Sequence, residues 1–351
     1  MALEVRIQKK LGGFQLNIAF TAGAEWTGIL GASGCGKSMT LKCIAGVETP
    51  DEGFIRYNGR VLFDSERNIN LPPQQRRVGY LFQSYALFPH VTVLENIRIA
   101  LPKSTADKPA AARQTAARFC LEGLEDKRPG QLSGGQQQRA ALARLIASQP
   151  EMILLDEPFS ALDSHLRWRM ERELKEALAS FGGTVLMVSH SRDEIYRNCS
   201  QLCVFSAGTV DVAGSVRDVF QNPQTVQAAL LTGCKNISRA EKIGDTAIRA
   251  VDWGVELTTG TPVPPDMRYV GIRRHDVRLY PDLGGRANTV PVRLAYEVDN
   301  LFSYVATVRA EGAAHGEDGQ IECDLSKPGW KALRERPLFA RLPEERLLLL
   351  R

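Results

Sequence analysis

The alternation of apolar and polar residues divides the chain into an α/β part and a β-rich part. Residues 3–30 alternate as short strands, and residues 94–149 follow helical spacing and are rich in Ala, Arg and Gln. Two later apolar runs, 152–156 and 184–190, are short enough for buried parallel strands, and each ends in polar residues. Strands that alternate with helices predict an α/β fold over about the first 230 residues.

The pattern changes near Leu231, where short β-like runs begin to alternate with Gly, Pro and Asp turns. Runs such as 269–274 and 304–310 are typical of a small β-barrel or sandwich. We therefore expect two domains, an α/β domain over 1–232 and a β-rich domain over 233–351.

Composition and charge exclude several classes of protein. The 351 residues are 44% hydrophobic and 24% charged, which is ordinary for a globular chain. The 44 Lys and Arg residues and 40 Asp and Glu residues give a net charge of +4. The basic residues form no dense run, so we expect no nucleic-acid partner. There is no secretory signal and no apolar stretch of about 18 residues. The 7 scattered cysteines fit a reducing cytosol.

A glycine-rich segment, GASGCGKS at 31–38, fits the pattern G-x-x-x-x-G-K-[ST] between a strand and a helix. Its glycines let successive N–H groups point at phosphate oxygens, and the following helix adds its positive end. Lys37 can reach the β- and γ-phosphates, and the Ser38 hydroxyl can ligate Mg²⁺. The predicted phosphate-binding residues are Gly31, Ala32, Ser33, Gly34, Cys35, Gly36, Lys37, Ser38 and Met39.

Two adjacent carboxylates, Asp156 and Glu157, lie at the carboxyl end of the apolar run 152–156, within the segment MILLDEP. Such a pair is costly to bury unless a cation or a reaction uses it. Asp156 is the candidate that holds Mg²⁺ through water, and Glu157 is the candidate that polarises the attacking water.

The order of these motifs resembles the ATP-binding cassette (ABC) ATPases over most of residues 1–230. The motifs that carry the resemblance are GASGCGKS, Gln83 in LFQ, LSGGQQQR (132–139), MILLDEP, SALD (160–163) and His190. The resemblance implies a P-loop cassette with a mixed sheet and a helical subdomain at about 84–150, binding ATP and Mg²⁺. It also implies a following all-β domain of the oligomer-binding type.

The resemblance assigns roles to further residues. Gln83 would contact Mg²⁺ and the attacking water, His190 would bind the γ-phosphate, and Asp163 would lie at a dimer seam. Two cassettes of the family pack head-to-tail, so the signature of one copy would bind the ATP of the other. The residues implied for this contact are Ser133, Gly134, Gly135 and Gln136. Residues 133–135 also read as an ordinary helix cap, which is the plainer alternative.

One feature departs from the family. Its members usually stack adenine on an aromatic residue, commonly Tyr followed by Gly, near the N-terminus. Here the segment reads Leu11-Gly12-Gly13-Phe14. Phe14 is the candidate ring, and a core strand position is the alternative.

The segment 81–97 resembles the part of importer ATPases that meets a membrane subunit. Its Tyr85, Leu87, Phe88 and Pro89 predict an apolar groove for a short partner helix. The implied partners are a second copy of this chain, two integral-membrane permease subunits contacted near Gln83–Pro89, and an external solute-binding protein. The implied location is the cytoplasmic face of the bacterial plasma membrane.

The C-terminal part resembles accessory domains of importer ATPases. Segment 271–279 resembles a strand of accessory domains in importers for oxyanions, maltose-type sugars, polyamines and iron, and segments 231–240 and 284–300 are most similar to the molybdate and sulfate branch. Molybdate or tungstate is therefore the first expectation for the cargo, then sulfate, then polyamine or iron, with a non-transport ABC ATPase as a distant alternative. Lys235, Arg273, Arg274 and Ser303 could donate to a regulatory oxyanion, although surface polar groups are the plainer interpretation.

Overall fold

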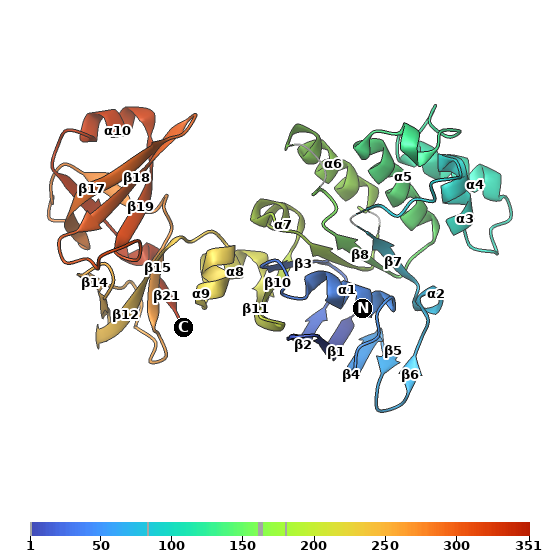
Figure 1. Cartoon of the computed structure of the whole chain (residues 1–351), viewed down its shortest axis with the longest axis horizontal. Coiled ribbons are helices and arrows are strands. Elements are labelled where there is room, and N and C mark those ends of the chain that lie inside the picture. Colours follow the sequence, from blue (N-terminus) through green and yellow to red (C-terminus); the bar gives the residue numbers. More distant parts are fainter. Residues whose placement is uncertain (1, 83, 161–163, 180) are drawn as a thin grey trace. The chain divides into compact units, whose positions relative to one another are not determined.

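The computed structural model describes residues 2–82, 84–160, 164–179 and 181–351, without the side chains of 164–166. The chain splits into two compact units, Met1–Arg217 and Asp218–Arg351 (Figure 1). Residues 218–232 group with the second unit here, whereas the sequence pattern assigned them to the first domain. The boundary after residue 232 stays a prediction, because compactness does not show which segment folds independently.

The centre of the first unit is a six-stranded sheet in the order β11-β10-β3-β9-β8-β7. Strands β10, β3, β9, β8 and β7 run parallel, and β8 and β9 are buried along their whole length, as expected for strands covered on both faces. The strands are β3 (Trp26–Gly31), β7 (Val78–Leu81), β8 (Met152–Asp156), β9 (Thr184–Val188), β10 (Gln201–Ser206) and β11 (Thr209–Ser215).

A second, antiparallel sheet in the order β2-β1-β4-β5-β6 completes the sheets of this unit. Its strands are β1 (Leu3–Leu11), β2 (Phe14–Ala22), β4 (Glu52–Tyr57), β5 (Arg60–Asp64) and β6 (Ile69–Asn70). Buried side chains of both sheets, such as Ile7, Leu16, Leu154 and Leu186, share one core cluster with helix α1 (Lys37–Ala45).

Helices α3, α4 and α5 lie together within the segment predicted to be a helical subdomain (Figure 1). The helices beyond α1 are α2 (Pro73–Arg76), α3 (Val93–Ala100), α4 (Lys108–Arg118), the short 3₁₀ turn η1 (Pro129–Gln131), α5 (Gly134–Ala147), α6 (Ser164–Ala177) and α7 (Arg192–Asn198). In the described ranges, no helix is both long and apolar enough to cross a bilayer.

The second unit contains two five-stranded sheets. The first, β14-β13-β12-β15-β21, consists of β12 (Asn236–Gly244), β13 (Ala247–Ala250), β14 (Val255–Thr258), β15 (Tyr269–Ile272) and β21 (Leu348–Leu350). The second, β16-β20-β17-β18-β19, consists of β16 (Arg278–Tyr280), β17 (Thr289–Asp299), β18 (Ser303–Ala310), β19 (Gln320–Ser326) and β20 (Leu338–Arg341).

The remaining elements of this part are α8 (Val216–Gln221), α9 (Val226–Leu231), α10 (Lys327–Leu333) and the 3₁₀ turn η2 (Glu344–Arg346). Trp253 and Trp330 are fully buried in a core cluster separate from that of the first unit. The structure thus has the predicted order, α/β first and β-rich second.

The C-terminal end of α1 is held by a buried arginine. Arg76 is 1% exposed and donates to the carbonyl oxygens of Cys43 and Ile44 at 2.8 and 2.9 Å. It also donates to the Leu71 carbonyl at 2.7 Å and to Asn70 Oδ1 at 2.8 Å. Burial lowers the pKa of this guanidinium to about 10, which leaves it charged at neutral pH. The residue therefore adds side-chain donors at a helix end, where the Gly46 N–H also donates to the Cys43 carbonyl at 3.2 Å.

Replacing this side chain should destabilise the first unit. In Arg76→Ala these carbonyls lose the guanidinium donors inside the core, although the Gly46 N–H still reaches Cys43, so the free energy of unfolding should fall by about 3 kcal/mol. Urea denaturation followed by circular dichroism measures this change. Arg67→Ala is the control, because Arg67 is 66% exposed and lies 3.7 Å from Asp64, and it should cost under about 1 kcal/mol. Equal losses in the two variants would refute the anchoring role of Arg76.

Candidate nucleotide-binding site

The glycine segment folds as a tight loop between β3 and α1. Gly34 and Gly36 have φ values of 79° and 103°, in the left-handed region that side chains disfavour. A Cβ on Gly36 would lie 2.3 Å from Leu16 Cδ1, and one on Gly31 would lie 2.5 Å from Cys35 Sγ. Gly31 is therefore required by close packing beneath the loop, and Gly36 is required both by close packing and by its backbone conformation.

Lys37 and its loop form a buried cationic centre with an exposed rim. The lysine is 5% exposed, and its ammonium donates to the carbonyl oxygens of Gly31 at 2.8 Å and Ala32 at 2.9 Å. Ala32, Ser33 and Gly34 are exposed, whereas Cys35 is buried and Met39 packs against the core. A buried ammonium at the start of a helix is suited to an anionic phosphate chain.

Asp156 lies 7% exposed at the end of β8 and accepts two hydroxyl hydrogen bonds. Ser38 Oγ donates to its Oδ1 at 2.8 Å, and the Tyr80 hydroxyl donates to its Oδ2 at 2.9 Å. Burial and the neighbouring carboxylate raise the pKa of Tyr80, so this hydroxyl stays protonated. The hydroxyl and carboxylate oxygens of Ser38 and Asp156 are the ligand types that Mg²⁺ prefers. The residues present thus fit the predicted metal.

Glu157 and His190 lie in contact just beyond the carboxyl ends of β8 and β9. His190 Nε2 lies 2.5 Å from Glu157 Oε1, and the Glu157 N–H donates to the Val188 carbonyl at 3.0 Å. Glu157 has φ of 50°, a conformation that costs about 1 kcal/mol or more for a non-glycine residue. Both side chains line a pocket of about 320 Å³. The structure brings these predicted residues together.

A buried network behind His190 was not predicted. Ser189 Oγ donates to Glu194 Oε2 at 2.5 Å and accepts from the Ser191 N–H at 2.9 Å, so the chain on both sides of the histidine is held. Arg167 Nε lies 3.6 Å from Glu194 Oε1. Burial raises the pKa of Glu194. The sequence contains one pattern that could have indicated this network, the spacing S-x-x-E at 191–194, which is typical of a helix start. In the structure Ser191 Oγ accepts from the Glu194 N–H at 3.3 Å.

Phe14 lies beside the glycine loop. Its Cε1 would be 3.6 Å from a Cβ placed on Gly36, and its Cζ would be 3.1 Å from one on Gly208. The ring is partly buried and packs against the first core. Phe14 therefore lies near the glycine loop, as expected for an adenine-stacking ring. It also contacts the core, as expected for the alternative, a core strand position. The stacking role stays a prediction.

The signature residues start another helix, away from the glycine loop. Ser133 caps α5 through its Oγ, which accepts from the Gln136 N–H at 3.4 Å, while Gln136 Oε1 accepts from the Ser133 N–H at 2.9 Å. Gly134 and Gly135 form the first turn. Helix α5 packs against α3, α4, α6 and β7, whereas α1 packs against β3, β7 and β8. One chain thus presents two separate helix starts suited to anions.

An apolar groove of about 390 Å³ follows β7. It is lined by residues of β7, α3 and α5, such as Tyr80, Ile99 and Arg144, and by Phe82 and Phe88, which lie between β7 and α3. Phe88 is 48% exposed and Ile99 52% exposed.

The predicted apolar strip is only partly on the surface. Phe88 and Pro89 are exposed, Leu87 is half-buried and Tyr85 is buried, so Tyr85 cannot line the surface strip. Arg144 donates to the carbonyl oxygens of Ala86 at 2.6 Å and Tyr85 at 3.1 Å, which fixes this turn.

Two predicted residues, Gln83 and Asp163, lie outside the described residues. Sequence reasoning also missed Tyr80, which belongs both to the Asp156 contact and to the groove. The sequence feature that could have indicated Tyr80 is its polar hydroxyl within an otherwise apolar strand.

Comparison with known proteins identifies the family. Residues 15–160 match the family model described as ABC transporter. The chain is 36% identical over 312 residues to the Fe(3+) ions import ATP-binding protein FbpC of Brucella abortus (strain 2308), covering 86% of each chain. It is 38% identical over 265 residues to the spermidine/putrescine import ATP-binding protein PotA of Nitratidesulfovibrio vulgaris, covering 73% of this chain and 70% of that one.

A solved structure agrees with this match. The dimeric ATP-binding cassette MJ0796, in a post-hydrolysis state bound to ADP and Pi, superposes with a TM-score of 0.53 at 28% identity, over 62% of this chain and 99% of that one. This similarity confirms the predicted cassette fold. The chain therefore belongs to the ABC transporter family, as an ATP-binding protein of the importer type.

Proposed function

We propose that the chain is the ATP-hydrolysing subunit of an import complex and works as a homodimer beneath two permease subunits at the cytoplasmic face of the plasma membrane. An external solute-binding protein would deliver the cargo. The observation that carries the proposal is the meeting of Lys37, Ser38, Asp156, Glu157 and His190 at one sheet edge. Ligands of α/β proteins bind at this edge, beyond the carboxyl ends of the strands.

The chemistry follows from positioning and charge. Lys37 and the loop N–H groups would hold the phosphates, and Ser38 and Asp156 would hold Mg²⁺, which supplies charge neutralisation at the transferred phosphoryl group. Glu157 would orient the attacking water, and the 2.5 Å contact with His190 fixes the direction of its carboxylate. Gln83 is proposed to share the metal and water contacts. The strained backbone of Glu157 holds this side chain in the lining of the pocket.

The second helix start supports a dimer. Ser133, Gly134, Gly135 and Gln136 would bind the ATP held by the glycine loop of the other copy, with Asp163 at the seam. The different surroundings of the two helices favour this arrangement, because α5 packs against α3, α4 and α6 whereas α1 packs against β3 and β8, although both also contact β7.

Coupling to the membrane would pass through Tyr80. Its ring lines the groove proposed to receive a permease helix, and its hydroxyl donates to Asp156 at 2.9 Å. A helix entering beside Phe88 would therefore press on a residue that also positions the metal ligand. The apolar lining of the groove suits the apolar face of a short helix.

The cargo is proposed to be a cation, with ferric iron first and polyamine second. The relative that covers 86% of both chains is named for Fe(3+) ions, and the relative at 38% identity is named for spermidine and putrescine. Neither name supports molybdate, which the sequence segments had favoured, or sulfate. Iron leads because that alignment also spans most of the accessory unit.

Replacing the carboxylate that orients water should separate ATP binding from hydrolysis. Glu157→Gln should lower the rate of phosphate release at least about 100-fold and accumulate an ATP-bound dimer on size-exclusion chromatography. The control is Glu151→Gln at the other end of β8, where the side chain is 38% exposed and pairs with Arg77, and it should hydrolyse at the wild-type rate. A Glu157→Gln protein that stays monomeric with MgATP and turns over normally would refute the assignment.

Complementation tests whether the signature acts on the partner's nucleotide. Ser133→Arg and Lys37→Ala should each be inactive alone. Mixed dimers should regain activity, because one of their sites combines an intact Lys37 with an intact Ser133. Phosphate release by the mixture measures this. If mixed dimers form and remain inactive, the signature does not act across the interface.

The cargo is tested by uptake in a strain that lacks this chain. Uptake of labelled Fe(3+) should fall and should return with the wild-type chain but not with Glu157→Gln. Labelled spermidine and molybdate are measured in parallel. A loss confined to spermidine selects the second candidate, and a loss confined to molybdate contradicts the cationic cargo.

A further inference from the structure

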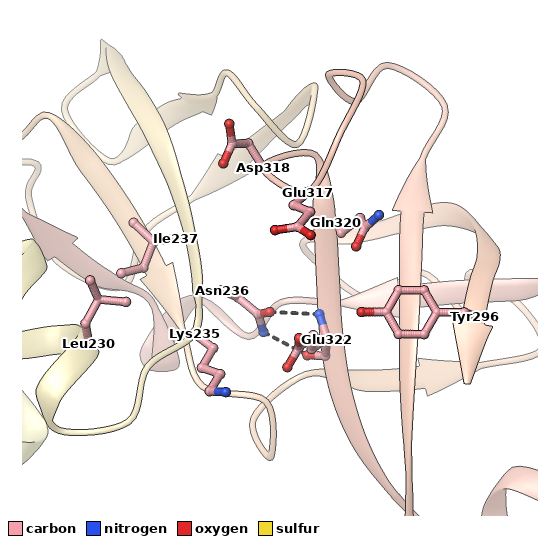
Figure 2. Close-up of a pocket in the computed structure, with 9 residues that line it drawn as sticks. All are labelled: Leu230, Lys235, Asn236, Ile237, Tyr296, Glu317, Asp318, Gln320 and Glu322. Atoms are coloured by element: carbon pink, nitrogen blue, oxygen red, sulfur yellow. Dashed lines mark hydrogen bonds between the residues drawn. The ribbon is translucent and has the colours of Figure 1, made fainter. Parts of the chain in front are cut away.

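A pocket of about 470 Å³ in the second unit contains polar groups that bond to each other (Figure 2). The Asn236 side chain donates to the Glu322 carbonyl at 2.8 Å and accepts from the Glu322 N–H at 2.7 Å. The lining also carries charges of both signs, from Lys235 and from acidic residues such as Glu317 and Asp318. The pocket beside the candidate catalytic residues differs, because a buried carboxylate there is bonded to the chain on both sides of a histidine.

This buried carboxylate belongs to Glu194, in the first turn of α7. The residue is 4% exposed and lines the pocket that also contains His190. Its Oε2 accepts from Ser189 Oγ at 2.5 Å, and its Oε1 lies 3.6 Å from Arg167 Nε on α6. A short hydrogen bond shielded from water is strong, so it fixes the relative position of the Glu194 and Ser189 side chains.

Ser189 transmits this constraint to the backbone beyond the histidine. The residue follows β9 directly and is 3% exposed. Its Oγ accepts from the Ser191 N–H at 2.9 Å, which closes a turn around His190 of the kind that serine side chains form with the backbone two residues on. Because a hydroxyl has a single proton, donation to Glu194 and acceptance from Ser191 together fix its direction.

A second buried carboxylate joins α6 to α7 without this connection. Glu171 of α6 is 5% exposed. It accepts from Arg197 Nη2 at 2.8 Å, from Arg197 Nε at 2.9 Å and from Asn198 Nδ2 at 3.3 Å. Glu171 and Glu194 are thus equally buried, but the hydrogen bonds given for Glu171 go to the end of α7, whereas Glu194 is bonded beside His190.

We propose that Glu194 is a positioning residue for ATP hydrolysis, which acts through Ser189 on His190. The imidazole is itself in contact with the next group, since His190 Nε2 lies 2.5 Å from Glu157 Oε1. A turn held by Glu194 therefore also sets the direction of the Glu157 carboxylate. Because Glu157 and His190 act in the proposed hydrolysis, this role of Glu194 rests on that function.

Phosphate release by the full chain at saturating MgATP measures the role. Glu194→Ala should lower kcat about tenfold or more, because small displacements of reacting groups are costly. Glu194→Gln should restore most of the rate, since its amide oxygen can still accept from Ser189. The control is Glu171→Ala, which removes an equally buried carboxylate and should keep kcat within about twofold of the wild type. Equal losses of kcat in Glu194→Ala and Glu171→Ala overturn the positioning role.

A double-mutant cycle separates positioning from general destabilisation. In a chain that already carries His190→Ala, adding Glu194→Ala should lower the single-turnover rate by less than about twofold, because the group being positioned is absent. Ser189→Ala removes one buried oxygen and should reproduce both results, which keeps the test valid if Glu194→Ala does not fold. Losses that multiply in the double variants overturn the proposal.

The position of His190 can be read without hydrolysis, from the imidazole proton resonances of the full chain without nucleotide. The His190 resonance is assigned by its loss in His190→Gln. It should shift in Glu194→Ala and Ser189→Ala and stay near its wild-type position in Glu194→Gln and Glu171→Ala. A resonance that does not move in Glu194→Ala or Ser189→Ala overturns the inference. If it moves as expected but the wild-type chain releases no phosphate, the proposed function fails and the positioning of His190 by Glu194 stands.

Discussion

The carboxylate of Asp156 is the point on which the nucleotide site depends. It is buried at the end of β8 and is held by hydroxyl groups from α1 and β7, at 2.8 and 2.9 Å. A buried carboxylate without such donors would be costly, so its presence ties three elements together. Any movement of α1 or β7 therefore moves the candidate metal ligand, and the reverse is also true.

This arrangement gives a physical account of coupling within the first unit. At one end, Arg76 anchors the carbonyls of α1, so the helix that carries Lys37 and Ser38 is fixed to the core. At the other end, Tyr80 extends from Asp156 into the apolar groove. The path from the groove to the candidate phosphate-binding loop thus consists of one ring, one carboxylate and one helix. Glu157 and His190 lie beside this path, with their backbone held by Val188 and by the network around Glu194.

The sequence was sufficient for the fold class and for candidate site residues that the structure brings together, because these depend on local patterns. The glycine loop and the residues ending β8 are contiguous motifs, and their spacing reflects the backbone that binds phosphate. Tyr80 was missed because its role arises from a contact between distant elements, the pair Tyr80–Asp156, 76 residues apart. Glu194 was missed although its contacts with Ser189 and Ser191 are local. Helix α10 was missed as well, although Ser326 caps it and Pro328 lies in its first turn. The cargo could not be deduced, since an ATPase subunit of this kind need not touch what is transported.

The central claim is that each ATP is held by the glycine loop of one copy and the signature of another. It is tested most directly by the specific rate of phosphate release measured against protein concentration. The account predicts a specific rate that rises with concentration as dimers form, and that falls toward zero where sedimentation shows only monomers. A specific rate that stays constant down to concentrations at which the chain sediments as a monomer would contradict it.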